Sequence, residues 1–247
     1  IFSTLLGGSR DERAWAIELG PDGSVYITGT TFSWDYPIAN ELMNGEGYLK
    51  GDAFVTRLSP DGIELIFSTY LGGGLRDDGG DIAVDSLGAV IVVGTTASPE
   101  FPVTRGVDTT FNGALDIFVL KLSPNGDSLE FGTFWGGSNV EGEWVDYSQA
   151  HVAVDNQGFI CVGSWTWSHD FPLINHVDST VRGYTEACVV KFTPSVDSVI
   201  YSTLLGGDYF DRCSDIAVDR YGYVYVMGEV VDIGNFPRPG PSGVFQI

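Results

Sequence analysis

Lysine is almost absent from this sequence, which contains only Lys50, Lys121 and Lys191. With 33 acidic residues against 12 lysines and arginines, the formal net charge is −21. Such a surface repels phosphate groups, so we expect neither a nucleic acid nor an anionic membrane as a partner. The acidity has two interpretations: a solvated surface that favours solubility, or a surface that attracts cations.

Long apolar runs are missing too, so the sequence predicts no membrane-spanning helix and no insertion into a membrane. Cysteine is scarce, and three cysteines give no disulfide framework. Cys161 and Cys188 fall on neighbouring predicted strands, where one bridge is geometrically feasible. We favour the alternative, in which both are buried free thiols, and Cys213 has no evident partner.

Sequence signatures of catalysis are also lacking. The chain has no nucleophile elbow, zinc-peptidase motif, phosphate-binding loop or dinucleotide fingerprint. The histidines at 151, 169 and 176 share no metal-ligand spacing. These observations favour a non-enzymatic protein.

One eight-residue pattern recurs along the chain, with an aromatic residue in second position and two glycines at its end. Its copies begin at Ile1, Ile66, Glu130 and Ile200. The aromatic residues of successive copies are 65, 64 and 70 residues apart. A regular period of this length indicates a repeat architecture.

Each repeat is expected to contain four short strands joined by tight turns. In the second repeat we expect strands over 81–85, 89–95, 116–122 and 128–135, and the turn pair Asn125-Gly126 is a strong hairpin signal. Several of these strands are apolar at nearly every position, which is typical of strands buried on both faces. Four-stranded units of this kind predict the blades of a β-propeller. A β-solenoid is the alternative, but its repeats are usually shorter.

The predicted fold class is therefore all-β, a partial or open propeller of four-stranded antiparallel blades with about four repeats. We expect a fragment of a longer propeller, whose open edges pair with the remainder of that propeller or with another copy. The predicted boundaries are residues 1–8 for the last strand of a preceding blade, 9–73, 74–137 and 138–207 for three blades, and 208–247 for an incomplete blade.

The repeat resembles the bacterial SBBP β-propeller repeat. The resemblance covers almost the whole chain, and its third copy departs from the family by lacking the glycine in Pro194-Ser195-Val196-Asp197. It implies a propeller of more than four blades in a secreted or surface-attached prokaryotic protein. The residues that carry it are Ile66–Gly73, Asp81–Asp85, Val25–Thr30, Asp170-Phe171-Pro172, Gly51–Val55 and Arg57–Gly62.

Antiparallel strand order places two sets of long loops on one face, here called the loop face. One set joins the second and third strands of a blade, and the other joins one blade to the next. Carboxylates that gather with backbone carbonyls suit a hard cation, so calcium is the cofactor that these loops suggest. The alternative is that the same carboxylates cap turns by accepting backbone N–H groups. The candidate metal ligands are Asp77, Asp78, Asp81, His151, Asp208, Asp211 and Asp215.

Three of these candidates share one repeat position. Asp81, His151 and Asp215 each begin the first strand of a blade, so we expect them around the mouth of a central channel. Such a ring suits a metal or water, and a hydrated channel without a specific ligand is the alternative.

Tryptophans supply the other candidate site. An acidic residue or Asn, an aromatic residue and a proline recur in the loops of every copy, which favours a structural role for that motif. The tryptophans Trp34, Trp144, Trp165 and Trp167 are not repeated, and they predict an aromatic platform for a sugar or peptide.

From these features we expect a non-enzymatic extracellular or cell-surface module that acts as a scaffold, an adhesion surface or a ligand-binding surface. Its expected partner is a glycan or an envelope protein. The alternative is a carbohydrate-binding lectin or a polysaccharide-active enzyme that uses the loop face.

Overall fold

The computed structural model describes residues 2–43, 50–142, 150–231 and 236. Over these residues every regular element is a β-strand, and no helix long and apolar enough to cross a membrane occurs. The strands are β1 (Glu12–Leu19), β2 (Val25–Thr31), β3 (Asp52–Leu58), β4 (Leu65–Leu71), β5 (Asp77–Val84), β6 (Val90–Thr96), β7 (Asp116–Leu122), β8 (Leu129–Trp135), β9 (His151–Val154), β10 (Ile160–Thr166), β11 (Glu186–Phe192), β12 (Val199–Leu205), β13 (Asp211–Val218) and β14 (Val224–Val230).

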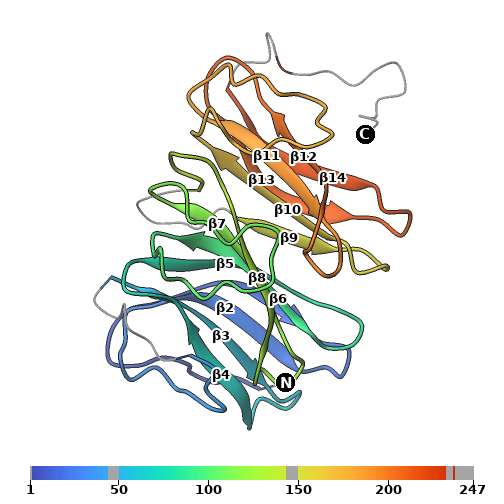
Figure 1. Ribbon diagram of the computed structural model, residues 1–247. Helices are drawn as coiled ribbons and strands as arrows, with labels where there is room; N and C mark the ends of the chain where they lie inside the picture. The colour runs from blue at the N-terminus through green and yellow to red at the C-terminus, as the bar shows by residue number, and fades with distance from the viewer. Residues whose placement is uncertain (1, 44–49, 143–149, 232–235, 237–247) are drawn as a thin grey trace.

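These strands form four antiparallel sheets, β1–β4, β5–β8, β9–β12 and β13–β14, in which neighbours in sequence are neighbours in space (Figure 1). The first strands of successive sheets contact one another, β1 with β5, β5 with β9 and β9 with β13. They therefore lie around a common axis, and the sheets radiate from it as blades. This confirms the predicted propeller fragment with open sheets, and the antiparallel sheets are incompatible with the β-solenoid alternative.

The core lies between blades, because each sheet presses apolar side chains against the next. Phe67 of the first blade, Val92 of the second and Phe118 behind it belong to one cluster. Ile117, Val162 and Val190 belong to the next cluster, which joins the second and third blades.

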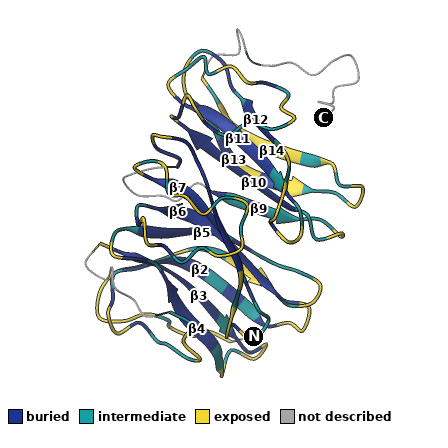
Figure 2. Cartoon of the chain, in the orientation of Figure 1, coloured by how far each residue is buried: buried dark blue, intermediate teal, exposed yellow. Residues whose placement is uncertain are grey.

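The burial of an apolar strand depends on whether its blade has a neighbouring blade on each side. All seven residues of β6 are buried, because the second blade has a neighbour on each side. β14 occupies the same place in the last sheet, yet Tyr225 and Met227 are exposed (Figure 2). The sequence of β14 is thus that of a strand covered on both faces, but its residues are exposed or only partly buried.

A β-bulge in the first hairpin of a blade is matched by a glycine in the facing strand. In the second blade the register shifts between Gly79 and Asp81, and Gly79 pairs with Gly94. A Cβ on Gly94 would lie 2.0 Å from the carbonyl oxygen of Asp78. Gly29 and Gly228 occupy the equivalent positions and meet the same obstacle.

The turn between β11 and β12 shows how a departure from the repeat is accommodated. The equivalent turns use Gly62 and Gly126 with a φ of 71°, and Val196 adopts a φ of 52° in their place. A left-handed conformation disfavours a β-branched residue. Val196 is fully buried in the core of the third blade, and this burial offsets the backbone cost.

All three cysteines are buried and unbridged, which confirms the prediction of free thiols. Burial raises the pKa of Cys161 and of Cys213 to about 12. Burial also raises the pKa of Cys188 well above its usual value.

Replacing Gly94 with alanine should destabilise the second blade, because backbone atoms of β5 occupy the place of the new methyl group. We expect a loss of about 1–3 kcal/mol in the free energy of unfolding, the usual cost of overpacking. Denaturant titration measures it, with Ser86→Ala in an exposed turn as the control. Equal stability of the two variants would contradict the packing described.

The native protein should react slowly with a thiol reagent, because the thiolate is the reactive form and burial suppresses it. After unfolding in denaturant, three thiols per chain should react at once. A count of one thiol in the unfolded, unreduced protein would reveal a disulfide and refute the assignment.

Candidate functional site

The two sets of long loops meet on one face, as the strand order predicts. The hydroxyl and N–H of Ser9 donate to the Asp35 carboxylate, at 2.9 and 2.8 Å. Ser138 donates to Asp170 in the same way two blades later. These carboxylates therefore hold loops of the loop face together. The N–H of the neighbouring serine lowers the pKa of Asp35 and of Asp170.

The aromatic residue that follows each of these carboxylates is buried, as its repetition predicts. Tyr36, Phe101 and Phe171 are each at most 4% exposed. The ring of Phe101 stacks on Phe118, with centroids 4.5 Å apart. The motif is thus part of the blade core.

Asp77 begins β5 and is fully buried beneath the loop face. It accepts hydrogen bonds from the N–H of Gly73 at 2.8 Å, from the hydroxyl of Ser98 at 3.0 Å, and from the hydroxyl of Thr96. Burial raises the pKa of Asp77 to about 7, and the nearby Asp52 carboxylate adds to the shift. These contacts are those of a turn cap.

Two more candidate metal ligands, Asp78 and Asp211, form hydrogen bonds or ion pairs with other residues of the protein. Asp78 forms an ion pair with Arg76 at 2.7 Å and accepts the hydroxyl of Thr30. Asp211 accepts the N–H of Gly207 at 2.6 Å, as Asp77 does with Gly73. Within the described ranges, no three His, Cys, Asp or Glu side chains converge as a metal site would require.

Asp81, His151 and Asp215 lie near one another at the common axis. Asp81 accepts the N–H of Ile82 at 2.8 Å and that of Val152, on the next blade, at 2.9 Å. Burial raises the pKa of Asp81, while the charge of His151 lowers it and that of Asp215 raises it. The structure therefore brings these three together as the repeat predicts, with Asp81 bridging two blades.

The structure does not bring the tryptophans of the predicted platform together on one exposed surface. Trp165 is 2% exposed and packs between the third and fourth blades, where the guanidinium of Arg212 lies 5.3 Å from its ring centroid. The ring centroid of Trp167 lies 6.2 Å from that of Trp165, and Trp167 is 43% exposed. Trp34 is 66% exposed on the first blade, with the second blade in between. Trp144 lies outside the described residues. The ring faces of Trp165 are thus not accessible to a ligand.

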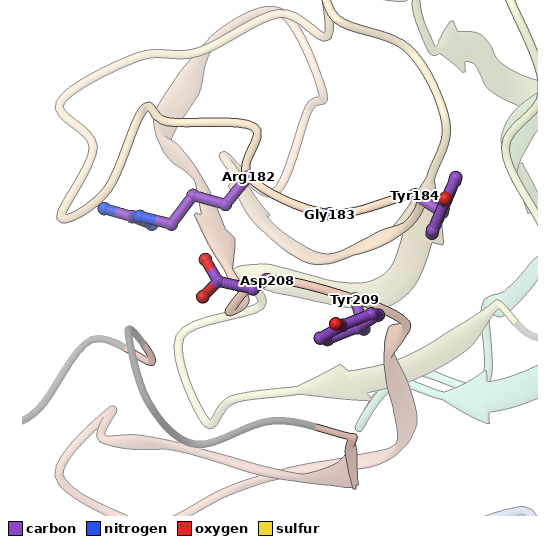
Figure 3. Close-up of a pocket in the computed structure, with 5 residues that line it drawn as sticks. All are labelled: Arg182, Gly183, Tyr184, Asp208 and Tyr209. Atoms are coloured by element: carbon purple, nitrogen blue, oxygen red, sulfur yellow. The ribbon is translucent and has the colours of Figure 1, made fainter.

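A pocket opens on the loop face between the third and fourth blades. It is lined by Arg182, Gly183, Tyr184, Asp208 and Tyr209, with the charged pair on one side and the two phenol rings on the other (Figure 3). Tyr184 is stacked on Phe210 at 5.1 Å and leaves 66% of its surface exposed. The pocket therefore offers exposed aromatic surface beside opposite charges.

The backbone fixes this pocket. The N–H of Tyr184 donates to the carbonyl of Tyr209 at 2.8 Å. A Cβ on Gly183 would lie 1.9 Å from the same carbonyl, so only glycine allows the approach. Arg182 is held by an ion pair with Asp178.

Of the pocket residues, only Asp208 was expected from the sequence. Tyr184 and Tyr209 stand where the second blade has Ala114 and Asn139. An unrepeated aromatic residue at a loop position is the sequence signal that marks both tyrosines, as it marks the tryptophans.

Replacing Asp77 with alanine should lower the free energy of unfolding by about 3 kcal/mol, because three buried donors lose their acceptor. Chemical denaturation measures this, with Glu64→Ala on the exposed surface as the control. A loss as small as that of the control would refute the turn-cap role.

Comparison with known sequences supports the repeat assignment. The model of the SBBP family, described as a β-propeller repeat, matches residues 200–229. These residues span β12, β13 and most of β14. A search of curated proteins found no match to the chain. The chain is therefore similar to the SBBP β-propeller repeat over residues 200–229.

Proposed function

We propose that this chain is a ligand-binding β-propeller module of an extracellular or cell-surface protein, and that its ligand occupies the loop face at the pocket between the third and fourth blades. The observation that carries the proposal is the pair of tyrosines, 66% and 47% exposed, beside Arg182 and Asp208. Exposed aromatic rings on a rigid scaffold are typical of recognition sites.

A glycan is the ligand class that this chemistry favours. Phenol rings pack against the C–H faces of sugar rings, while a guanidinium and a carboxylate bond to hydroxyl groups. The net charge of −21 disfavours polyanionic glycans, so a neutral or cationic glycan is expected. The acidic surface also suits a protein exposed to the medium, where charge favours solubility.

Binding is favoured over hydrolysis. A glycosidase needs two carboxylates across the scissile bond. Asp35 and Asp170, the acidic residues near the tryptophans, instead hold backbone N–H groups of the loops.

Screening on an array of neutral and cationic glycans, followed by titration calorimetry, tests the proposal. We expect Tyr209→Ala to weaken binding of the best glycan at least tenfold, about 1.4 kcal/mol, as a central aromatic contact would. Tyr221→Ala is the control, because Tyr221 is also an exposed tyrosine, 69% exposed against 47% for Tyr209, but lies in a turn on the opposite face.

An array without a reproducible hit, or a bound glycan whose affinity Tyr184→Ala and Tyr209→Ala leave unchanged, would overturn the proposal. Circular dichroism of the variants would confirm that they remain folded.

A further inference from the structure

Two acidic side chains, Asp116 and Glu141, face each other at the junction of the second and third blades. Asp116 begins β7, and Glu141 lies in the loop that enters the third blade. Both side chains are fully buried. Asp116 Oδ1 and Glu141 Oε2 lie 2.7 and 2.6 Å from the point where a Cβ on Gly136 would stand. The two carboxyl groups therefore face each other across a glycine.

One oxygen of each carboxyl group is satisfied by the protein. Asp116 Oδ2 accepts the N–H of Asn112 at 2.9 Å, and Glu141 Oε1 accepts the hydroxyl of Thr166 at 2.8 Å and that of Ser168. The facing oxygens, Oδ1 and Oε2, accept no hydrogen bond of normal geometry from the described residues. The backbone N–H groups of Gly113 and Gly137 make weaker approaches to Asp116 and Glu141, and the two carboxyl groups interact with each other. A hydrogen bond between the two carboxyl groups forms only when one of them is protonated, because a carboxylate has no donor.

The surroundings offer no compensating positive charge. Asp108 and the thiol of Cys188 are the further titratable groups that interact electrostatically with the pair. Within the described part of the chain, no lysine or arginine forms an ion pair with either carboxylate. Two buried carboxylates so close cannot both ionise without a large cost. Burial raises the pKa of Asp116 to about 6 and that of Glu141 to about 7.

A bound calcium ion fits this pair poorly. Calcium takes six to eight oxygen ligands, and two buried carboxylates provide too few while solvent is excluded. A proton needs only the two facing oxygens.

The arrangement recurs at the neighbouring junctions. Gly72 is also flanked by two acidic side chains, Asp52 and Asp77, and Gly206 by Glu186 and Asp211. At these junctions the facing oxygen of Asp77 or Asp211 also accepts a glycine N–H. The recurrence shows that the facing acids belong to the design of the blade junction.

We propose that Asp116 and Glu141 share one proton across the junction of the second and third blades, and that this junction weakens as the pH rises past neutral. The folded state retains a proton that the unfolded chain releases near the ordinary carboxyl pKa of 4.5. The contribution of the pair to stability is therefore complete below that pH and falls as the pH rises to about 7.

Glu141→Gln tests the proposal, because its amide oxygen can accept from Thr166 and Ser168 while its amide N–H replaces the shared proton. We expect the melting temperature to equal that of the unaltered chain at pH 5 and to exceed it by about 2–4 °C at pH 8. Asp116→Asn should behave in the same way. The double variant leaves amide facing amide, so it should melt below the unaltered chain at both pH values.

Glu64→Gln, an exposed change of the same chemistry, controls for the loss of one negative charge. Each protein is melted with about 2 mM calcium, which exceeds the dissociation constants of about 0.1–1 mM typical of extracellular calcium sites, and again with chelator. The proposal is overturned if both single variants melt lower than the unaltered chain at both pH values. It is equally overturned if calcium raises the melting temperature of the unaltered chain but not that of Glu141→Gln, which would assign the site to the cation.

Discussion

Burial of apolar strands between adjacent sheets is the interaction on which the rest of this structure depends. A blade is a small antiparallel sheet with no core of its own, and it becomes stable by covering a neighbour. The buried residues of β6 illustrate the effect, because Val90 and Val92 face one blade while Ile91 and Val93 face the other. At β14, against which the described residues place no further sheet, the same kind of sequence exposes tyrosine and methionine.

Packing of this kind is insensitive to sliding and rotation, so the blades also need directional contacts. Polar groups of the loop face supply them. Asp77 accepts hydrogen bonds from a glycine amide and two hydroxyl groups, and Asp81 accepts one from the N–H of Val152 on the next blade. These carboxylates hold the loop before β5 and the first strands of two adjacent blades in register, since each hydrogen bond tolerates little displacement. Because they lie away from solvent, burial raises the pKa of Asp77 and of Asp81.

Because the carboxylates are committed to the scaffold, the recognition surface is built from other residues. Tyr184 and Tyr209 extend from loops whose backbones are tied together, so the pocket is positioned by the junction of two blades. Its residues break the repeat, whereas the residues that hold the loops obey it. Residues that recur in every repeat stabilise the blade. Residues that differ between repeats give one junction its own surface.

The sequence by itself determined the fold class, the strands, the faces on which the loops lie and the burial of the repeated aromatic residues such as Phe101. These follow from short-range patterns, turn residues and periodicity, which act within one repeat. The repeat alignment also predicted that Asp81, His151 and Asp215 lie near one axis. Only the tertiary structure decided that Trp165 is covered by Arg212, that Asp77 serves as a turn cap, that Asp116 faces Glu141, and that two tyrosines line a pocket. Each of these depends on residues that lie far apart in the sequence or on different loops, and the local pattern carries no signal that would pair them.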